Sequence, residues 1–260
     1  MEHTYVIIRH GCREWVNRLW SNMSIHAAAL ETNARVINLS FFERSPFLSP
    51  LHSLFSLLIG RLVRRSTGIW SPLAQTKNLP PTEPLTDRFA HRKVLFFFGW
   101  LFRNPMGFEK YRTELLAQFD PTPAQRTAID AQLAPHAGKT LLGVYMRYKP
   151  FRFFDDDEFL ISRERTMEIV EEYIHKNNLN RDKMAIIETS DHDDEQTTFQ
   201  LLSRCSVIIG TNSTYCNLAS WFGNVPHIVT FNEPIDWEYY RNKNTFFENK
   251  YATFAYGGKL

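Results

Sequence analysis

Features of exported and membrane-spanning proteins are scarce in this sequence. Its three cysteines, Cys12, Cys205 and Cys216, are too few for a disulfide framework, and none lies in a Cys-x-x-Cys pair. The N-terminus has neither the basic start nor the apolar core of a signal peptide. No apolar run approaches the ~20 residues that span a bilayer. We therefore expect a protein of a reducing compartment, with a cytoplasmic location.

An excess of charge and the common catalytic motifs are also missing. The 30 basic and 28 acidic residues leave a formal net charge of +2, so the composition makes no case for nucleic acid as a partner. No His-x-x-x-His zinc pair, Gly-x-x-x-x-Gly-Lys-Ser loop, Gly-x-Ser-x-Gly elbow or dinucleotide fingerprint occurs. These absences count against zinc peptidases, kinases, α/β-hydrolases and Rossmann dehydrogenases.

What is present is an alternation of short apolar strands and helical patterns, typical of an α/β protein. We expect strands at residues 5–9, 36–39, 94–98, 140–146, 184–187, 207–209 and 227–229, and helices at 17–32, 109–119 and 163–176. Residues 120–139 contain three prolines and Gly138, and are interpreted as a joint between lobes. The prediction is two α/β lobes, residues 1–136 and 137–260, with a ligand cleft between them.

Prolines enclose an insertion at residues 45–84, whose centre, residues 51–70, is apolar and basic. Its apolar residues share a helical face, and Arg61, Arg64 and Arg65 crowd its end. Such a helix can lie on an anionic membrane surface as a peripheral contact. It can equally pack on the body of the protein, with the arginines near its C-terminal dipole. We favour packing because the apolar face is short.

The segment at residues 201–223 is the most informative part of the sequence. A buried strand runs into Gly210-Thr-Asn-Ser-Thr214, and these small polar residues open a helix with Leu218, Ala219 and Phe222 on its apolar face. Glycine lets a ligand approach the backbone, and the free N–H groups of the helix can hold a phosphate. Alternatively, Asn212, Ser213 or Thr214 serves only as an N-cap. Both interpretations stay open from the pattern alone.

Arg147 and two acidic clusters are further candidates for a site. Arg147 follows the strand at 140–146, at the edge where doubly wound folds bind ligands, and a guanidinium there can grip a pyrophosphate; the alternative is a surface ion pair. The clusters at 155–158 and 191–195 both contain Asp-x-Asp, which can ligate a divalent metal but is also typical of solvated loops. Asp191 is the better placed of the second cluster because it follows a predicted strand.

Four segments of the chain occur in an order that is found in one enzyme family. They are Ile7-Ile-Arg-His-Gly11 with Asn17 and Asn33-Ala-Arg-Val36; Gly99-Trp-Leu-Phe with Phe108-Glu-Lys-Tyr111; Gly143-Val-Tyr-Met-Arg-Tyr-Lys149; and Asn212-Ser-Thr-Tyr-Cys-Asn-Leu-Ala219. With these segments the chain resembles the α-1,2-fucosyltransferase family, family 11 of the glycosyltransferases, and its wider relatives with a GT-B-like fold.

The last two segments show both the match and the departures. The family's His-x-Arg-Arg-Gly-Asp-Tyr places its first arginine, which contacts the donor diphosphate, at Arg147, but its histidine is replaced by Tyr145 and its second arginine by Tyr148. The family's Asn-Ser-Thr-Phe-Ser-Trp-Trp-Ala is closely matched from Asn212 onward. The Gly-Asn pair that the family has in its first loop is absent before Asn17. The chain therefore resembles a divergent relative rather than a standard member.

The resemblance implies a GT-B-like fold and inverting transfer of fucose or another deoxyhexose from a GDP-linked donor to a glycan hydroxyl, in surface polysaccharide or glycan synthesis. It implies donor contacts from Arg147, Asp191, Thr211, Asn212, Ser213, Thr214 and Asn217. Because some relatives use a carboxylate shortly after the arginine, Asp155 is our first choice of catalytic base and Glu158 our second. Gly11 and Asn17 would lie on the acceptor side. No metal or other cofactor is expected, since a guanidinium and backbone dipoles can neutralise the diphosphate.

Two alternatives from other classes remain. One is a metal-dependent GT-A type transferase that uses Asp155 and Asp157, or Asp191 and Asp193. The other is a non-catalytic nucleotide-sugar or glycan-binding protein, which the altered motif around Tyr145 and Tyr148 suggests.

Overall fold

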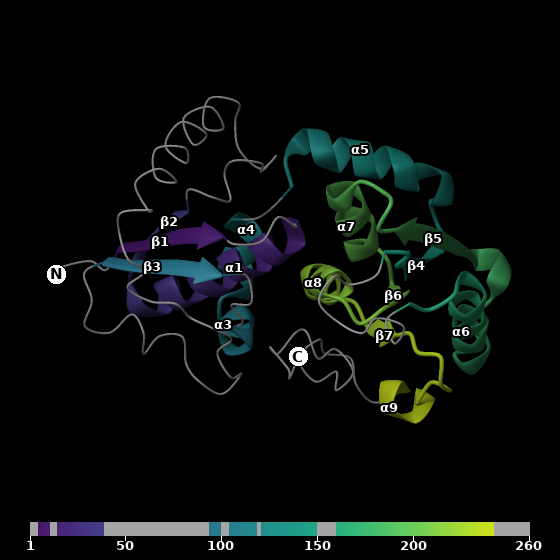
Figure 1. Cartoon of the computed structure of the whole chain (residues 1–260). Coiled ribbons are helices and arrows are strands. Elements are labelled where there is room, and N and C mark those ends of the chain that lie inside the picture. Colours follow the sequence, from purple (N-terminus) through teal and green to yellow (C-terminus); the bar gives the residue numbers. More distant parts are fainter. Residues whose placement is uncertain are drawn as a thin grey trace. The chain divides into compact units, whose positions relative to one another are not determined.

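The computed structural model describes residues 5–10, 15–38, 94–99, 104–118, 121–149 and 160–241. The insertion at 45–84, with the apolar and basic segment at 51–70, lies outside the described residues. So do Gly11, Asp155, Asp157 and Glu158. The described part of the chain forms two compact units, the first ending at Thr122 and the second beginning at Pro123 (Figure 1).

The first unit contains a three-stranded parallel sheet. Its strands β1 (Tyr5–His10), β2 (Arg35–Asn38) and β3 (Val94–Gly99) lie in the order β2-β1-β3. Helix α1 (Trp15–Thr32) connects β1 to β2 and ends at Asn33, whose φ of 54° is the left-handed conformation that terminates helices. The predicted strand, helix and parallel strand at this end of the chain are therefore confirmed.

Helix α1 is buried on nearly all sides rather than along one stripe. Leu19, Met23 and Ala27 are fully buried, whereas Leu30, in the last turn, is 45% exposed. Trp20 stacks on Phe108, with 5.9 Å between ring centroids.

The helix predicted at 109–119 is instead two short helices, α3 (Pro105–Lys110) and α4 (Arg112–Gln118). They are separated at Tyr111, whose backbone leaves the helical region with φ −115° and ψ 29°.

The second unit is built on a four-stranded parallel sheet, in the order β5-β4-β6-β7. The strands are β4 (Thr140–Met146), β5 (Met184–Ser190), β6 (Val207–Gly210) and β7 (His227–Val229). Strands that are covered on both faces read as continuous apolar runs, and β6 and β7 are buried along their whole length. All four strands were predicted from such runs.

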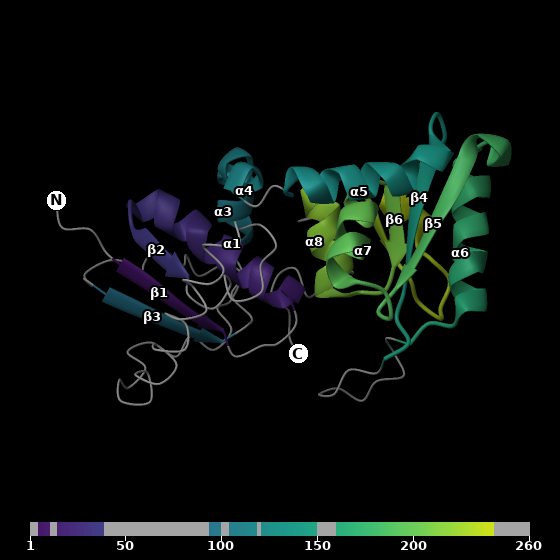
Figure 2. The ribbon, with the colours of Figure 1, turned by 90° about the horizontal axis from the view of Figure 1, so that it is seen from above.

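Helices cover both faces of this sheet (Figure 2). Helix α6 (Arg163–Lys176) packs Ile169, Val170 and Ile174 against Val144 and Ile209 on one face. The other face is covered by α5 (Pro123–Leu133), α7 (Glu195–Ser203) and α8 (Thr214–Gly223). Helix α7 is the next element after β5, and α8 is the next element after β6. A last short helix, α9 (Trp237–Arg241), ends the described chain.

The division between the two units falls inside the segment predicted as a joint, residues 120–139, but most of this segment is helical and forms α5 and a short 3-10 turn, η2 (Ala134–His136). Proline suits the first turn of a helix, and Pro123 begins this one. Ile129 buries its side chain in a cluster with Ile187 and Leu201, so α5 belongs to the second unit. The division between the units therefore falls before α5, whereas the sequence prediction placed it after α5, between residues 136 and 137.

The observed architecture is the predicted α/β class, with parallel sheets that alternate with helices. Among the described residues, no helix combines the length and the apolar character that crossing a bilayer requires.

Candidate functional site

The four parallel strands of the second unit bring the turns that follow them to one edge of the sheet. The chain passes from β4 outward to β5 and then returns to the other side of β4 to form β6. The strand order therefore reverses between β4 and β6, and such a switch point is where doubly wound sheets bind ligands. Arg147 follows β4, Asp191 follows β5 and Thr211 follows β6, so three predicted site residues share this edge.

Arg147 directly follows β4 and is partly buried. Its Nε donates a hydrogen bond to the carbonyl oxygen of Lys149, at 2.7 Å. Burial raises the pKa of the Cys216 thiol to about 12, while the hydrogen bond with Ser213 and the positive charge of Arg147 act in the opposite direction. Strand β4 pairs directly with β6, so Arg147 and the N-terminus of α8 follow neighbouring strand ends at the same edge of the sheet.

The turn between β6 and α8 does more than cap a helix. Ser213 is the N-cap, since its Oγ accepts the N–H of Cys216 at 3.2 Å, and the capping interpretation is confirmed for this residue. Asn212 and Thr214 are also buried. Thr211 is only 2% exposed, and its hydroxyl has no hydrogen-bond partner among the described residues. Leaving a buried hydroxyl unpaired costs roughly 1–3 kcal/mol, so capping does not account for Thr211.

Thr230 is a second buried hydroxyl at this edge, and the sequence prediction missed it. It follows β7, is 3% exposed, and lacks a partner for its Oγ1 among the described residues. Its backbone N–H donates to the carbonyl oxygen of Gly210, at 2.9 Å, which places it beside the β6–α8 turn. The one available signal was a threonine directly after the predicted strand at 227–229.

Asn217 lies beneath the β6–α8 turn rather than in an open position. It is fully buried, and its Oδ1 is 2.8 Å from Nδ1 of His227. Burial lowers the pKa of His227 to about 4, so the ring is neutral near pH 7, and its Nε2 lies 3.3 Å from the carbonyl oxygen of Gly210. This buried pair holds α8, β7 and the end of β6 together. Contact between Asn217 and the donor stays a prediction.

Asp191 ties two turns together through its carboxylate. One oxygen accepts the N–H of Tyr148 at 3.1 Å, and the other accepts the N–H of Lys149 at 2.9 Å. The ammonium of Lys149 donates in return to the carbonyl oxygen of Asp191. The side chain predicted to bind the donor therefore already braces the turn that carries Arg147.

The rest of the acidic cluster at 191–195 is engaged in the same way. Asp193 accepts the N–H of Ser190 at 2.6 Å and its hydroxyl at 3.0 Å, and Asp194 is the N-cap of α7, accepting the N–H of Thr197. No group of three or more potential metal ligands occurs within the described ranges. The second acidic cluster is thus a braced turn that opens a helix.

The two tyrosines that depart from the family motif have different surroundings. Tyr145 is 4% exposed and stacks on Tyr215, with 5.0 Å between centroids, and burial raises its pKa. Tyr148 is 46% exposed and stacks on the ring of His192, with 5.4 Å between centroids. Tyr145 thus supports α8 from below, whereas Tyr148 faces outward at the edge of the sheet.

The acceptor-side residues belong to the first unit. Asn17 is 7% exposed in the first turn of α1, and Gly11 lies outside the described residues. Their predicted role stays a prediction.

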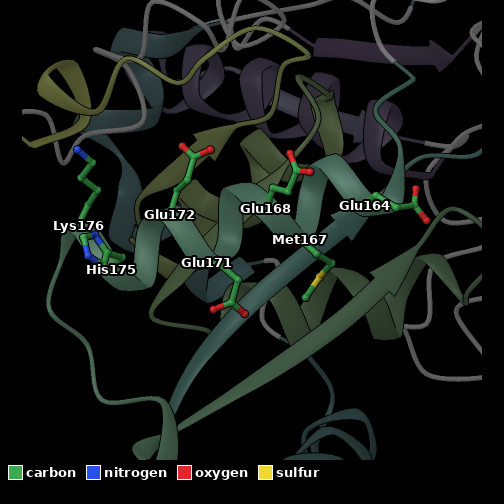
Figure 3. Close-up of a pocket in the computed structure, with 7 residues that line it drawn as sticks. All are labelled: Glu164, Met167, Glu168, Glu171, Glu172, His175 and Lys176. Atoms are coloured by element: carbon green, nitrogen blue, oxygen red, sulfur yellow. The ribbon is translucent and has the colours of Figure 1, made fainter.

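A shallow pocket of about 730 Å³ lies along α6 (Figure 3). It is lined by Glu164, Met167, Glu168, Glu171, Glu172, His175 and Lys176. Several of these carboxylates already have partners, because Arg165 pairs with Glu168 and Glu172, and Glu172 also accepts from Trp237. An acidic surface of this kind does not suit a diphosphate, so we do not assign the donor to it.

No protein-family model matches the sequence, and no curated protein sequence is significantly similar to it. Several solved structures are similar. Arabidopsis thaliana FUT1, as a mutant in complex with GDP, has a TM-score of 0.51 and 13% identity, over 88% of this chain and 70% of that one. POFUT1 in complex with GDP has a TM-score of 0.53 and 10% identity, over 90% of this chain and all (100%) of that one.

NodZ, an α-1,6-fucosyltransferase soaked with GDP-fucose, has a TM-score of 0.51 and 15% identity, over 87% of this chain and 94% of that one. Similarity at such low identity concerns the fold. The chain has an α/β fold of the GT-B-like kind found in these fucosyltransferases, as predicted, and the closer resemblance to the α-1,2-fucosyltransferase family stays a prediction.

Proposed function

We propose that this chain is a glycosyltransferase that moves fucose, or another deoxyhexose, from a GDP-linked donor to a hydroxyl of a glycan. The observation that carries the proposal is the pairing of β4 with β6, which brings Arg147 to the same sheet edge as the β6–α8 turn, where the buried hydroxyl of Thr211 has no partner among the described residues. Solved structures of the same fold hold GDP or were soaked with GDP-fucose.

The proposed role of this edge is to stabilise the leaving diphosphate. A guanidinium can form two parallel hydrogen bonds with phosphate oxygens and stays charged at any working pH. The N-terminus of α8 adds a positive dipole end, and Thr211 and Thr230 offer hydroxyl donors. Donors that are held in place before the reaction stabilise charge as it develops on the leaving group. We therefore propose that the donor binds without a metal.

The transfer itself is proposed to proceed with inversion, by direct attack of the acceptor hydroxyl on the anomeric carbon. The acceptor then has to be held in line with the leaving group, and a carboxylate can take its proton as the bond forms. Asp155 remains our first candidate for this base and Glu158 our second, with Gly11 and Asn17 on the acceptor side. We place the reaction in surface polysaccharide or glycan synthesis in the cytoplasm, with residues 51–70 as a candidate peripheral membrane contact.

A thermal-shift screen with GDP-, UDP- and dTDP-sugars in EDTA tests the proposal. A ligand that binds only the folded state raises the melting temperature, so we expect GDP-fucose to produce the largest shift. Release of GDP from GDP-fucose is then measured on the same sample. Donor binding without release or transfer would favour the non-catalytic binding protein, and release that EDTA abolishes would favour a metal-dependent transferase. A folded chain that binds none of these donors would contradict the proposal.

A further inference from the structure

We propose that Tyr148 and His192 form a platform on which the nucleobase of the donor stacks. The inference rests on the proposed function, because it concerns how the same edge recognises a nucleoside diphosphate. It assigns a role in nucleotide binding to two residues that the donor-site prediction did not include.

The first observation is an exposed aromatic side chain in the turn after β4. Tyr148 is 46% exposed, and among the described residues Leu30 is the other strongly exposed large apolar side chain. Its ring is nearly parallel to that of His192, with an interplanar angle of 25° and 5.4 Å between centroids. Two rings from different turns thus form one exposed aromatic surface, here called the Tyr148–His192 platform.

The platform is held from several directions. The N–H groups of Tyr148 and Lys149 both donate to the carboxylate of Asp191, which joins the turn after β4 to the turn after β5. The hydroxyl of Tyr148 donates to Sδ of Met146 at 3.3 Å, and the N–H of His192 donates to Oγ of Ser190 at 3.2 Å. Because these hydrogen bonds already restrain the turns that carry the rings, a ligand that stacks on the rings has less motion to immobilise.

The position of the platform selects the nucleobase as its occupant. Tyr148 directly follows Arg147, and His192 follows Asp191 at the end of β5. In Rossmann-like sheets the pyrophosphate lies at the switch point, and the nucleoside extends over the end of the second strand of the unit. Here β4 is the first strand and β5 the second, so a diphosphate at Arg147 directs its nucleoside toward β5. The platform lies on that side.

The chemistry of the platform agrees with this placement. Every base offers a flat π-face, and stacking on an aromatic side chain contributes roughly 1–3 kcal/mol per base. An acceptor sugar can also lie on an aromatic ring, but the sugar end of the donor, and the acceptor that attacks it, point away from the nucleoside. The topology therefore favours the base.

Isothermal titration with GDP and with inorganic pyrophosphate tests the inference. For Tyr148→Ala we expect GDP affinity to fall about ten-fold and pyrophosphate affinity to stay unchanged, because only GDP carries a base to stack. Tyr148→Phe keeps the ring and should bind GDP within about two-fold of the wild type. His192→Ala should show an intermediate loss. Tyr239→Ala, which removes a partly exposed tyrosine from α9, serves as the matched control and should bind both probes normally.

Four outcomes would overturn the inference. If the wild type binds GDP and Tyr148→Ala binds it equally well, the platform has no nucleotide role although the donor site stands. If Tyr148→Ala weakens GDP and pyrophosphate to the same degree, the tyrosine only supports the Arg147 turn. If GDP affinity is unchanged while the KM for the glycan acceptor rises, the platform binds the acceptor. Failure of the folded wild type to bind GDP would remove the proposed function, and this inference with it.

Discussion

Two turns on the same edge of one sheet use their polar residues in opposite ways. The turn between β5 and α7 contains Asp191, Asp193 and Asp194, and each of these carboxylates accepts hydrogen bonds from nearby backbone N–H groups. The turn between β6 and α8 contains only small polar residues, and Thr211 keeps a buried hydroxyl without a partner among the described residues. The acidic turn is complete in itself, whereas the small polar turn has a donor left for a ligand.

The comparison shows why charge is a poor guide to function in this chain. Clusters of aspartates are the most conspicuous candidates in the sequence, yet in the β5–α7 turn they stabilise loops and start a helix. A threonine attracts less notice, but a buried hydroxyl that the protein itself does not satisfy calls for an outside partner. The predictions below test this contrast, beginning with the largest expected effect.

Replacing Arg147 should have the greatest effect on activity. Removing a positioned donor to a leaving group typically costs 10²–10³-fold in rate, so we expect Arg147→Ala to lower kcat/KM for GDP-fucose by about 10³-fold or more. Arg147→Lys should recover part of the loss, since lysine keeps the charge but not the two parallel hydrogen bonds. Kinetics and circular dichroism on both variants provide the test. Full activity in a folded Arg147→Ala protein would show that the β4 turn has no part in donor binding.

Gly223→Ala should have the greatest effect on stability, because the added methyl group would force apart α7 and α8, the helices that follow these two turns. A Cβ at this position would lie 2.0 Å from the carbonyl oxygen of Ser203, at the end of α7. A backbone atom cannot move away as a side chain tip can, and we expect a loss of more than about 3 kcal/mol in unfolding free energy. Gly138→Ala is the control, since apart from its chain neighbours no atom of the described residues lies within 4 Å of its Cβ position.

For that control, the positive φ of Gly138, 79°, should cost only about 1 kcal/mol. Urea unfolding of both variants measures the difference. Equal stability of the two variants would mean that α7 and α8 are not in contact as the structure has them.

The pH dependence of stability should come from the β6–α8 side of the comparison. The pKa of His227 is lowered to about 4 when folded, against 6.5 as the ordinary value, because the ring is buried. Between these two pH values the unfolded chain therefore binds more protons than the folded one. The contribution of His227 to the free energy of unfolding is fully present above pH 6.5 and is lost as the pH falls toward 4. At pH 5 the loss should be on the order of 2 kcal/mol.

His227→Gln should flatten part of this dependence, as measured by urea unfolding at pH 7 and pH 5. Burial also lowers the pKa of His26 to about 4, so this residue should still contribute to the pH dependence of stability in the variant. A variant with the same slope as the wild type would contradict the buried, neutral state of His227.

The smallest effect should come from a matched pair of hydroxyl deletions. Thr189→Val in β5 removes a hydroxyl that donates to the carbonyl oxygen of Val144 at 3.0 Å, and should lower stability by about 1 kcal/mol without changing GDP affinity. Thr211→Val removes a hydroxyl that has no partner in the described part of the chain, and should leave stability unchanged or slightly higher while GDP affinity falls roughly ten-fold. Melting temperature and titration calorimetry on both variants make the comparison. The reverse pattern would show that Thr211 has a structural role only.

Much of the fold could be predicted from periodicity. The boundaries of β4, α6 and β7 agree residue for residue with the predicted ranges, because continuous apolar runs and an amphipathic helix leave a strong local pattern. The prediction failed where local signals are ambiguous. Prolines at 121 and 123 suggested a linker, but a proline is equally suited to begin a helix. Only the contact of Ile129 with α7 and β5 decides between a linker and a helix of the second unit.

The location of the site could be predicted from the sequence, but the contacts of its residues could not. Strand ends located Arg147, Asp191 and Thr211 at one edge, since parallel strands bring their carboxyl ends together. The sequence could not show that Asp191 is occupied by backbone N–H groups or that Asn217 pairs with His227, because both depend on residues far apart in the chain. Thr230 was missed for the same reason.

The account depends most on the claim that Arg147 and the β6–α8 turn together hold the diphosphate of a GDP-linked sugar. Titration calorimetry of GDP, in EDTA, against the wild type and Arg147→Ala tests it most directly. We predict clear binding to the wild type and a loss of about 100-fold or more in the variant, with both proteins equally folded. Absence of GDP binding to the folded wild type, or equal binding to the two proteins, would contradict the claim.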